Sequence, residues 1–286
     1  MKRLVLFGLV IWLAAPLTAW SADAPWRVGV TLPVYGSWLS AIGGERIEVV
    51  AIVPADADPH VYRPRPADLE RLGDLDVVIE NGAHDPWLDA MLRAALGEAA
   101  DALPRLRPAT SEHSFLSLVT ATREVRQLAE SLSRLDPDGA ATYRAGAEAL
   151  VRRLRAMLAE TMAALDALPG ARDVPLAAVH DGYGTLFAEL GLTLHAIVQP
   201  RHGVEPSARQ LADTIRRLRE ADVRVLFTEM DLEPTTAELI ERETGCMLAR
   251  LDHVADGAAT AERFEAGMAS NLETIVEVLR RAVETP

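Results

Sequence analysis

The chain has 286 residues, which is enough for two domains of modest size, and 49% of them are hydrophobic. Its formal net charge of −13 argues against nucleic acid or an anionic membrane surface as the main partner. Cys246 is the only cysteine, so the chain cannot form an internal disulfide.

The first 21 residues have the features of a secretory signal peptide. Met1-Lys2-Arg3 is a charged start, and residues 4–17 form an apolar run that is shorter than the ~20 residues of a membrane span. Small residues allow cleavage after residue 21, or as late as residue 24. No cysteine lies directly after the apolar run, where a lipid anchor would be attached. We therefore expect export to the periplasm, without a membrane anchor.

Residues 25–135 alternate β-branched runs with helical patterns, which predicts an N-terminal α/β lobe. We expect strands at 27–32, 47–53 and 76–80, and helices at 36–42, 66–72 and 85–96. A further helix is expected to begin at Ser111, with His113 in its first turn.

Residues 136–168 predict one long linking helix. Asp136 is a candidate N-cap, Pro137 suits the first helical position, and Pro169-Gly170 ends the pattern. Apolar residues recur at steps of three and four, and about 32 residues correspond to about 48 Å. Such a helix can cross a whole domain, so we expect it to join two lobes.

Residues 169–286 predict a C-terminal α/β lobe with a parallel sheet. Strands are expected at 174–179, 194–198, 223–228 and 247–251. Helices are expected at 186–190, from the cap at 205–207 to 221, at 234–244 and at 261–283. We find no internal repeat and no low-complexity segment.

Several metal-type side chains follow predicted strand ends, where open parallel sheets bind ligands. His60, His180, Glu229 and Asp252 lie at such ends, and His113 lies ahead of the long helix. Three imidazoles and one carboxylate would suit Zn²⁺ at about 2.0–2.2 Å. His84, His195, His202 and His253 are expected to be structural or surface residues. Glu229 and Asp181 either fix a ligand imidazole or are solvated acids.

At these residues the sequence resembles the zinc/manganese solute-binding proteins of ABC transporters. Asp58-Pro59-His60-Val61-Tyr62-Arg63-Pro64 is similar to a signature of that family, and so is the stretch from Asp76 to Asp89. The motif His180-Asp181-Gly182 and the stretches around Ser207, Glu229 and Gly245 follow in the same order. The resemblance covers nearly the whole chain after the signal peptide.

The resemblance implies two Rossmann-like lobes joined by the long helix, with one metal ion between them. It implies His60, His113, His180 and Asp252 as the ligands, although the residues around His113 depart from the family's motif. A histidine in the third position goes with zinc in this family, and a carboxylate more often with manganese. It also implies a membrane permease as partner, with a periplasmic metallochaperone as a second candidate.

We therefore expect a monomeric, non-enzymatic protein that captures Zn²⁺ for an ABC permease. A secreted zinc-dependent hydrolase is an alternative, because three histidines and an acid can also activate a metal-bound water. A manganese-specific member of the same family is a second alternative, and a metal-free adhesin or sugar-binding protein is a third.

Overall fold

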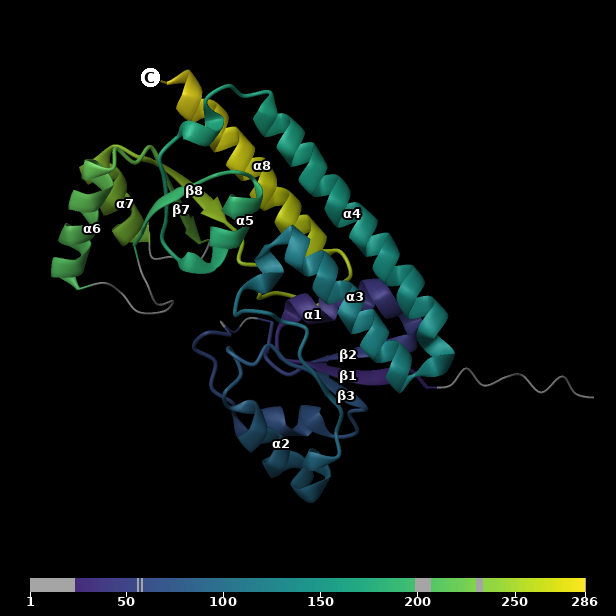
Figure 1. The fold of residues 1–286 in the computed structure, drawn as a ribbon. Coiled ribbons are helices and arrows are strands. Elements are labelled where there is room, and N and C mark those ends of the chain that lie inside the picture. Colours follow the sequence, from purple (N-terminus) through teal and green to yellow (C-terminus); the bar gives the residue numbers. More distant parts are fainter. Residues whose placement is uncertain (1–23, 56, 58, 199–206, 230–233, 286) are drawn as a thin grey trace, which may run out of the picture.

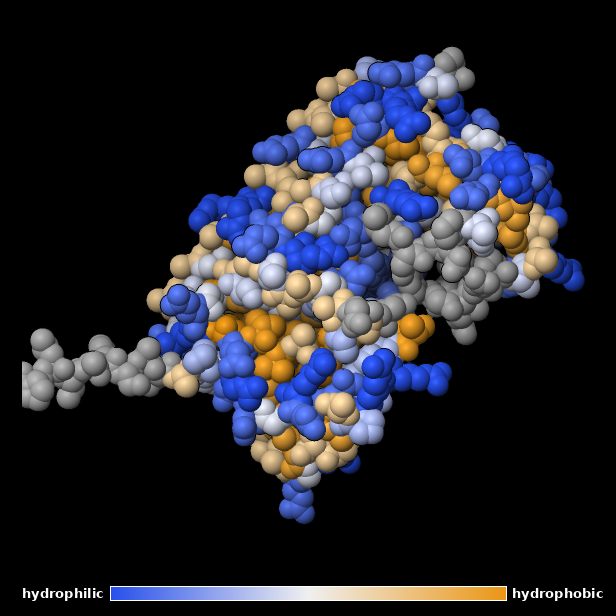
Figure 2. All heavy atoms as spheres, turned by 180° about the vertical axis from the view of Figure 1, so that it is seen from behind, coloured by the Kyte–Doolittle hydropathy of each residue, from blue (hydrophilic) through white to orange (hydrophobic). Residues whose placement is uncertain are grey.

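The computed structural model describes residues 24–285 except 56, 58, 199–206 and 230–233. The predicted signal peptide, residues 1–21, lies outside the described residues. Within the described part of the chain, no helix is both long and apolar enough to cross a membrane. Seen from behind, apolar residues form patches among hydrophilic ones (Figure 2).

The N-terminal lobe is built on a sheet of four parallel strands in the order β2-β1-β3-β4. Its elements are β1 (Trp26–Val30), α1 (Pro33–Gly43), β2 (Ile47–Ala51), β3 (Val77–Ile79), α2 (Leu88–Leu96) and β4 (Arg105–Leu106). The sequence did not predict β4, because two residues are too few to show a strand pattern. The predicted helix at 66–72 is present as a 3-10 helix, η2 (Pro66–Leu72).

The C-terminal lobe repeats the same strand arrangement in the order β6-β5-β7-β8, again all parallel. Its elements are β5 (Leu176–Ala178), α5 (Gly184–Glu189), β6 (Leu194–Ile197), α6 (Ala208–Glu220), β7 (Val225–Glu229), α7 (Pro234–Thr244), β8 (Met247–Leu251) and α8 (Arg263–Glu284). Ser207 begins α6 with a capping box, because its hydroxyl accepts from the Gln210 N–H. The predicted fold class, two parallel-sheet α/β lobes, is confirmed.

The long linking helix is α4 (Ala140–Asp166), and it starts four residues later than predicted. Asp136 caps a 3-10 turn, η5 (Pro137–Gly139), in which its side chain accepts from the Gly139 N–H. α4 lies alongside α8, and α3 (Leu118–Leu135) packs against it from the N-terminal lobe (Figure 1). Gly146 lets α4 approach α1 closely, because a Cβ there would lie 2.3 Å from the Ile42 carbonyl oxygen.

One hydrophobic core extends through both lobes and includes residues of α1, α3, α4 and α8. Trp38 of α1 shows the continuity, since its ring meets Tyr35 in the same helix and Phe264 of α8 at centroid distances of 5.5 and 5.4 Å. The lobes are therefore joined by packed helices as well as by the chain connection.

Residues 252–262, which we call the connector, run from β8 to α8 and reach the N-terminal lobe. The Ser37 hydroxyl donates to the Thr260 carbonyl at 2.5 Å, and the Gly257 N–H donates to the Ala55 carbonyl at 2.9 Å. These bonds fix a C-terminal segment against α1 and against the segment after β2. His253 lies at the start of the connector.

Candidate metal centre

Five histidines from the two lobes meet beyond the carboxyl ends of the parallel strands. Residues 60, 84 and 113 follow β2, β3 and β4, and residues 180 and 253 follow β5 and β8. Parallel strands end at the same edge of their sheet, so loops that are distant in sequence bring these rings together.

The ring nitrogens are close enough to share one ion. His60 Nε2 and His113 Nε2 are 3.1 Å apart, near the ~3.3 Å that separates two ligands of a tetrahedral zinc ion with Zn–N bonds of about 2.0–2.1 Å. The ring centroids of His113 and His180, which come from different lobes, are 4.6 Å apart. The site is therefore an interlobe one.

Two overlapping donor groups are found among the described residues, and each has its ligand atoms within 4.8 Å of one another. One contains His60, His84, Glu112 and His113, and the other contains His113, His180 and His253. The structure thus brings together the three predicted histidines, residues 60, 113 and 180. Their role as ligands stays a prediction.

His84 and His253 were expected to be structural or surface residues, and the structure places both beside the predicted ligands. His84 is buried, and its ring centroid lies 4.5 Å from that of His60. His253 lies 4.9 Å from His60 by the same measure. Both follow predicted strands by a few residues, so position alone could have identified them. His195 lies on β6, where Nδ1 accepts from the Leu176 N–H, and His202 is outside the described residues.

The expected start of the helix after Ser111 was wrong. His113 precedes a short 3-10 turn, η4 (Ser114–Leu116), and α3 begins only at Leu118, with the Ser117 hydroxyl accepting from the Thr120 N–H. The serine N-cap rule holds, but for Ser117 rather than Ser111. His113 consequently lies in a loop.

Asp252, the predicted fourth ligand, is held by Arg263 of α8. The guanidinium donates to both carboxylate oxygens, Nη1 to Oδ2 at 2.7 Å and Nη2 to Oδ1 at 2.9 Å. This ion pair holds the pKa of Arg263 above its usual range. The donor groups within the described part of the chain include His253 and not Asp252.

Glu229, one of the two acids predicted to fix a ligand, contacts His180. Its Oε1 lies 3.1 Å from His180 Nδ1, and both side chains are buried. A carboxylate in this place accepts the Nδ1 proton and directs the other ring nitrogen, as outer partners of metal-bound imidazoles do. Asp181 begins the 3-10 turn η7 (Asp181–Tyr183), and its side chain lies outside the described part.

Imidazole nitrogen dominates this set of donors. Imidazole suits Zn²⁺, Cu²⁺, Ni²⁺ and iron, whereas Mn²⁺ favours carboxylates, carbonyls and water. The arrangement can therefore strip a late first-row dication of most of its water and enclose it between the lobes.

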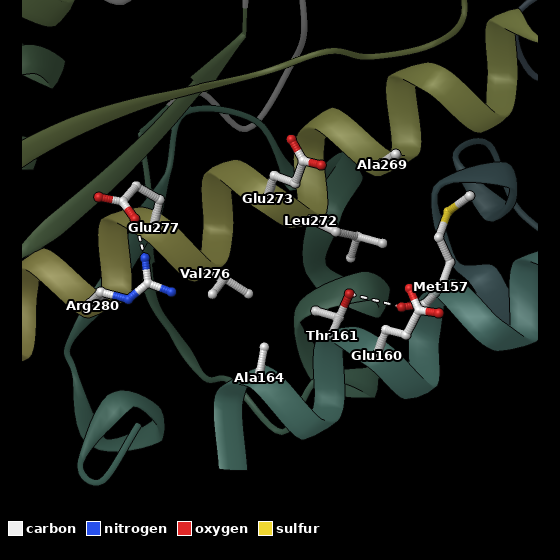
Figure 3. A pocket seen from close by; sticks show the side chains of 10 residues that line it. All are labelled: Met157, Glu160, Thr161, Ala164, Ala269, Leu272, Glu273, Val276, Glu277 and Arg280. Carbon is white, nitrogen blue, oxygen red and sulfur yellow. Dashed lines mark hydrogen bonds and ion pairs between the residues drawn. The ribbon is translucent and has the colours of Figure 1, made fainter. Parts of the chain in front are cut away.

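A separate cavity of about 430 Å³ lies between α4 and α8 (Figure 3). Its lining is partly apolar (Met157, Leu272 and Val276) and partly acidic (Glu160, Glu273 and Glu277). None of the five histidines lines it, so it is distinct from the candidate metal centre.

Comparisons with known proteins identify the family of the chain. The family model described as zinc-uptake complex component A, periplasmic (ZnuA), matches residues 28–278. FpvC of Pseudomonas aeruginosa, solved in complex with Mn²⁺, is 37% identical with a TM-score of 0.82 and covers 90% of this chain and 99% of its own. FpvC has also been solved with Ni²⁺.

Relatives of lower identity match over a similar share of the chain. The manganese-binding lipoprotein MntA of Halalkalibacterium halodurans is 24% identical over 88% of each chain. A crystal structure of ZnuA, at 24% identity and a TM-score of 0.73, covers 88% of this chain and 98% of its own and shares the fold. The match over most of the chain confirms the resemblance noted in the sequence: this chain belongs to the ZnuA family of metal-binding substrate-binding proteins of ABC transporters.

Proposed function

We propose that this protein captures a single transition-metal dication, Zn²⁺ first among them, between its lobes in the periplasm and delivers it to an ABC permease. The observation that carries the proposal is the convergence of five imidazoles from both lobes. A site shared by two lobes can enclose the ion when they pack together, and can release it when the membrane partner separates them.

The choice of Zn²⁺ rests on the donors. A site dominated by neutral imidazoles binds Zn²⁺ better than Mn²⁺, because affinity rises along the divalent series and Mn²⁺ prefers oxygen ligands. FpvC has been solved with Mn²⁺ and with Ni²⁺, so both ions are direct competitors to test, together with Fe²⁺.

We infer that residues 60, 113 and 180 supply three ligands and that His253 takes the fourth place that the resemblance gave to Asp252. His253 belongs to a donor group with His113 and His180, whereas both Asp252 oxygens accept from Arg263. For Asp252 to become a ligand, its carboxylate would have to be shared between the ion and the Arg263 guanidinium.

The donor set favours carriage of the ion over hydrolysis. A catalytic zinc keeps an open position for water, whereas a site that only holds its ion can fill all four positions with protein. Here the histidines alone outnumber the four positions of a tetrahedral ion. We accordingly expect no hydrolytic activity.

The test is metal analysis of protein purified without a histidine tag, followed by competition titrations with Zn²⁺, Ni²⁺, Fe²⁺ and Mn²⁺. We expect one Zn²⁺ per chain, affinity for Zn²⁺ well above that for Mn²⁺, and loss of the bound ion in His60→Ala. His195→Ala is the matched control, because His195 lies on β6, away from the cluster. Protein without stoichiometric metal, or an equal loss in both variants, would overturn the proposal.

A further inference from the structure

The two donor groups share one residue, His113, and one of them belongs entirely to the N-terminal lobe. Residues 60, 84, 112 and 113 all precede α3, whereas residues 180 and 253 belong to the other lobe. We propose that the N-terminal lobe alone forms a first binding position for the metal ion, with His84 and Glu112 as ligands that the family resemblance did not assign. This inference rests on the proposed function.

The loops that carry this group leave strands of one sheet. β2, β3 and β4 all belong to the sheet β2-β1-β3-β4, so the spacing of their carboxyl ends is set within the N-terminal lobe. The group needs no residue from beyond the linking helix to be complete. It is therefore present before the lobes enclose an ion.

His84 is held in the manner expected of a metal ligand. Its Nδ1 lies 2.9 Å from Asn81 Oδ1. The Asn81 amide is fixed because Nδ2 donates to the Tyr35 hydroxyl at 2.8 Å and to the Glu112 carbonyl at 3.1 Å, and a carbonyl can only accept. Oδ1 therefore accepts the Nδ1 proton of His84, and the lone pair of the ring is on Nε2.

That lone pair is directed toward the other donors. His84 Nε2 is 3.7 Å from Glu112 Oε1, and the ring centroids of His84 and His113 are 5.2 Å apart. An outer hydrogen bond that sets the tautomer and aims the second nitrogen is the usual support of a metal-bound imidazole.

Glu112 makes this position accessible from solvent. About half of its side chain is exposed (51%), whereas the His84 side chain is 1% exposed. A solvated carboxylate next to one buried and two half-buried imidazoles attracts a hydrated dication and supplies an oxygen while the ion still keeps some of its water. The N-terminal position is thus suited to capture, and the all-histidine group across the lobes to retention.

His113 connects the two positions. An ion bound by residues 60, 84, 112 and 113 can keep His60 and His113 while it exchanges His84 and Glu112 for His180 and His253. Such an exchange replaces one ligand at a time and never exposes the bare ion. We infer that capture on the N-terminal lobe precedes enclosure.

The test measures the Zn²⁺ affinity of variants by competition with a chelating dye, so that binding at each of the two positions is seen separately. The double variant His180→Ala/His253→Ala should still bind one Zn²⁺, more than tenfold more weakly than the native protein. Adding His84→Ala should weaken the remaining binding by a further factor of ten or more, and adding His195→Ala, the matched control, should leave it unchanged. Adding Glu112→Gln, a change at an exposed side chain that does not threaten folding, should also weaken it.

The outcomes distinguish this inference from the proposed function. If the native protein binds no Zn²⁺, the proposed function fails. If the native protein binds but the double variant, folded by circular dichroism, does not, only the N-terminal position is refuted. Equal binding with and without Glu112→Gln in the double variant would refute it as well.

Discussion

Arg263 of α8 forms a bidentate ion pair with Asp252, the first residue of the connector, with N–O distances of 2.7 and 2.9 Å. Asp252 Oδ1 also accepts from the Val254 N–H at 2.8 Å. Val254 has a φ of +51°, which is an uncommon conformation for a β-branched residue. The ion pair thus stabilises a tight turn, and His253 is the residue inside that turn.

We expect Asp252→Asn to retain metal and His253→Ala to lose affinity. The asparagine keeps an oxygen that can accept from the Val254 N–H, so the turn and His253 should stay in place. Zn²⁺ affinity should change by no more than a few-fold in Asp252→Asn, and should fall more than tenfold in His253→Ala. Isothermal calorimetry with chelator competition measures both, and the reverse order would restore Asp252 as the ligand.

Glu229 should act on the metal through His180. Glu229→Gln keeps the size of the side chain but removes the negative charge that accepts from His180 Nδ1. Loss of such an outer partner costs about 10–100-fold in metal affinity. Glu265→Gln, which breaks the Arg153–Glu265 pair between α4 and α8, is the control and should leave Zn²⁺ affinity unchanged. Equal affinities in the two variants would show that Glu229 has no such role.

Metal affinity should fall in acid. A histidine must be neutral to bind a metal ion, and free histidine titrates near pH ~6.5. With several imidazole ligands, apparent Zn²⁺ affinity should decrease by more than tenfold between pH 7.5 and pH 5. Calorimetry at the two pH values tests this, and identical affinities would contradict ligation by several histidines.

Asp136 should make the fold sensitive to acid at a place far from the metal. Hydrogen bonds from Arg46, with the Tyr143 hydroxyl as a further donor, lower the pKa of Asp136 from 3.8 to about 2. Because the pKa is lower in the folded state, the ionised carboxylate stabilises the fold above about pH 4. This stabilisation, about 2 kcal/mol, is lost as the pH falls toward 2.

Asp136→Asn should therefore lower the free energy of unfolding at pH 7 and have little effect at pH 2. Urea denaturation at several pH values measures the difference. Asp138→Asn is the matched control, because Asp138 is exposed two residues further along. A loss of stability in Asp136→Asn that is the same at pH 7 and at pH 2 would contradict the assignment.

Local patterns in the sequence were sufficient to predict the fold class, and they also predicted where a metal site would lie. Alternation of strand and helix patterns predicted parallel sheets, and the position of residues 60 and 180 after strands predicted ligands at the sheet ends, because hydrophobic periodicity and turn residues are local properties. The long apolar stripe likewise predicted the helix that became α4, apart from its first turn, which is 3-10 helix in the structure.

Which side chains meet at the candidate site follows from the packing of the two lobes. Arg263 lies on α8 and reaches Asp252 across the connector, and the amide of Asn81 is fixed by Tyr35 of α1 and by the backbone of Glu112. Contacts of this kind depend on how elements pack, and no spacing in the sequence encodes them. His84 and His253 also follow predicted strands, but the sequence does not show that their rings lie beside that of His60, because this depends on how the loops of the two sheets pack.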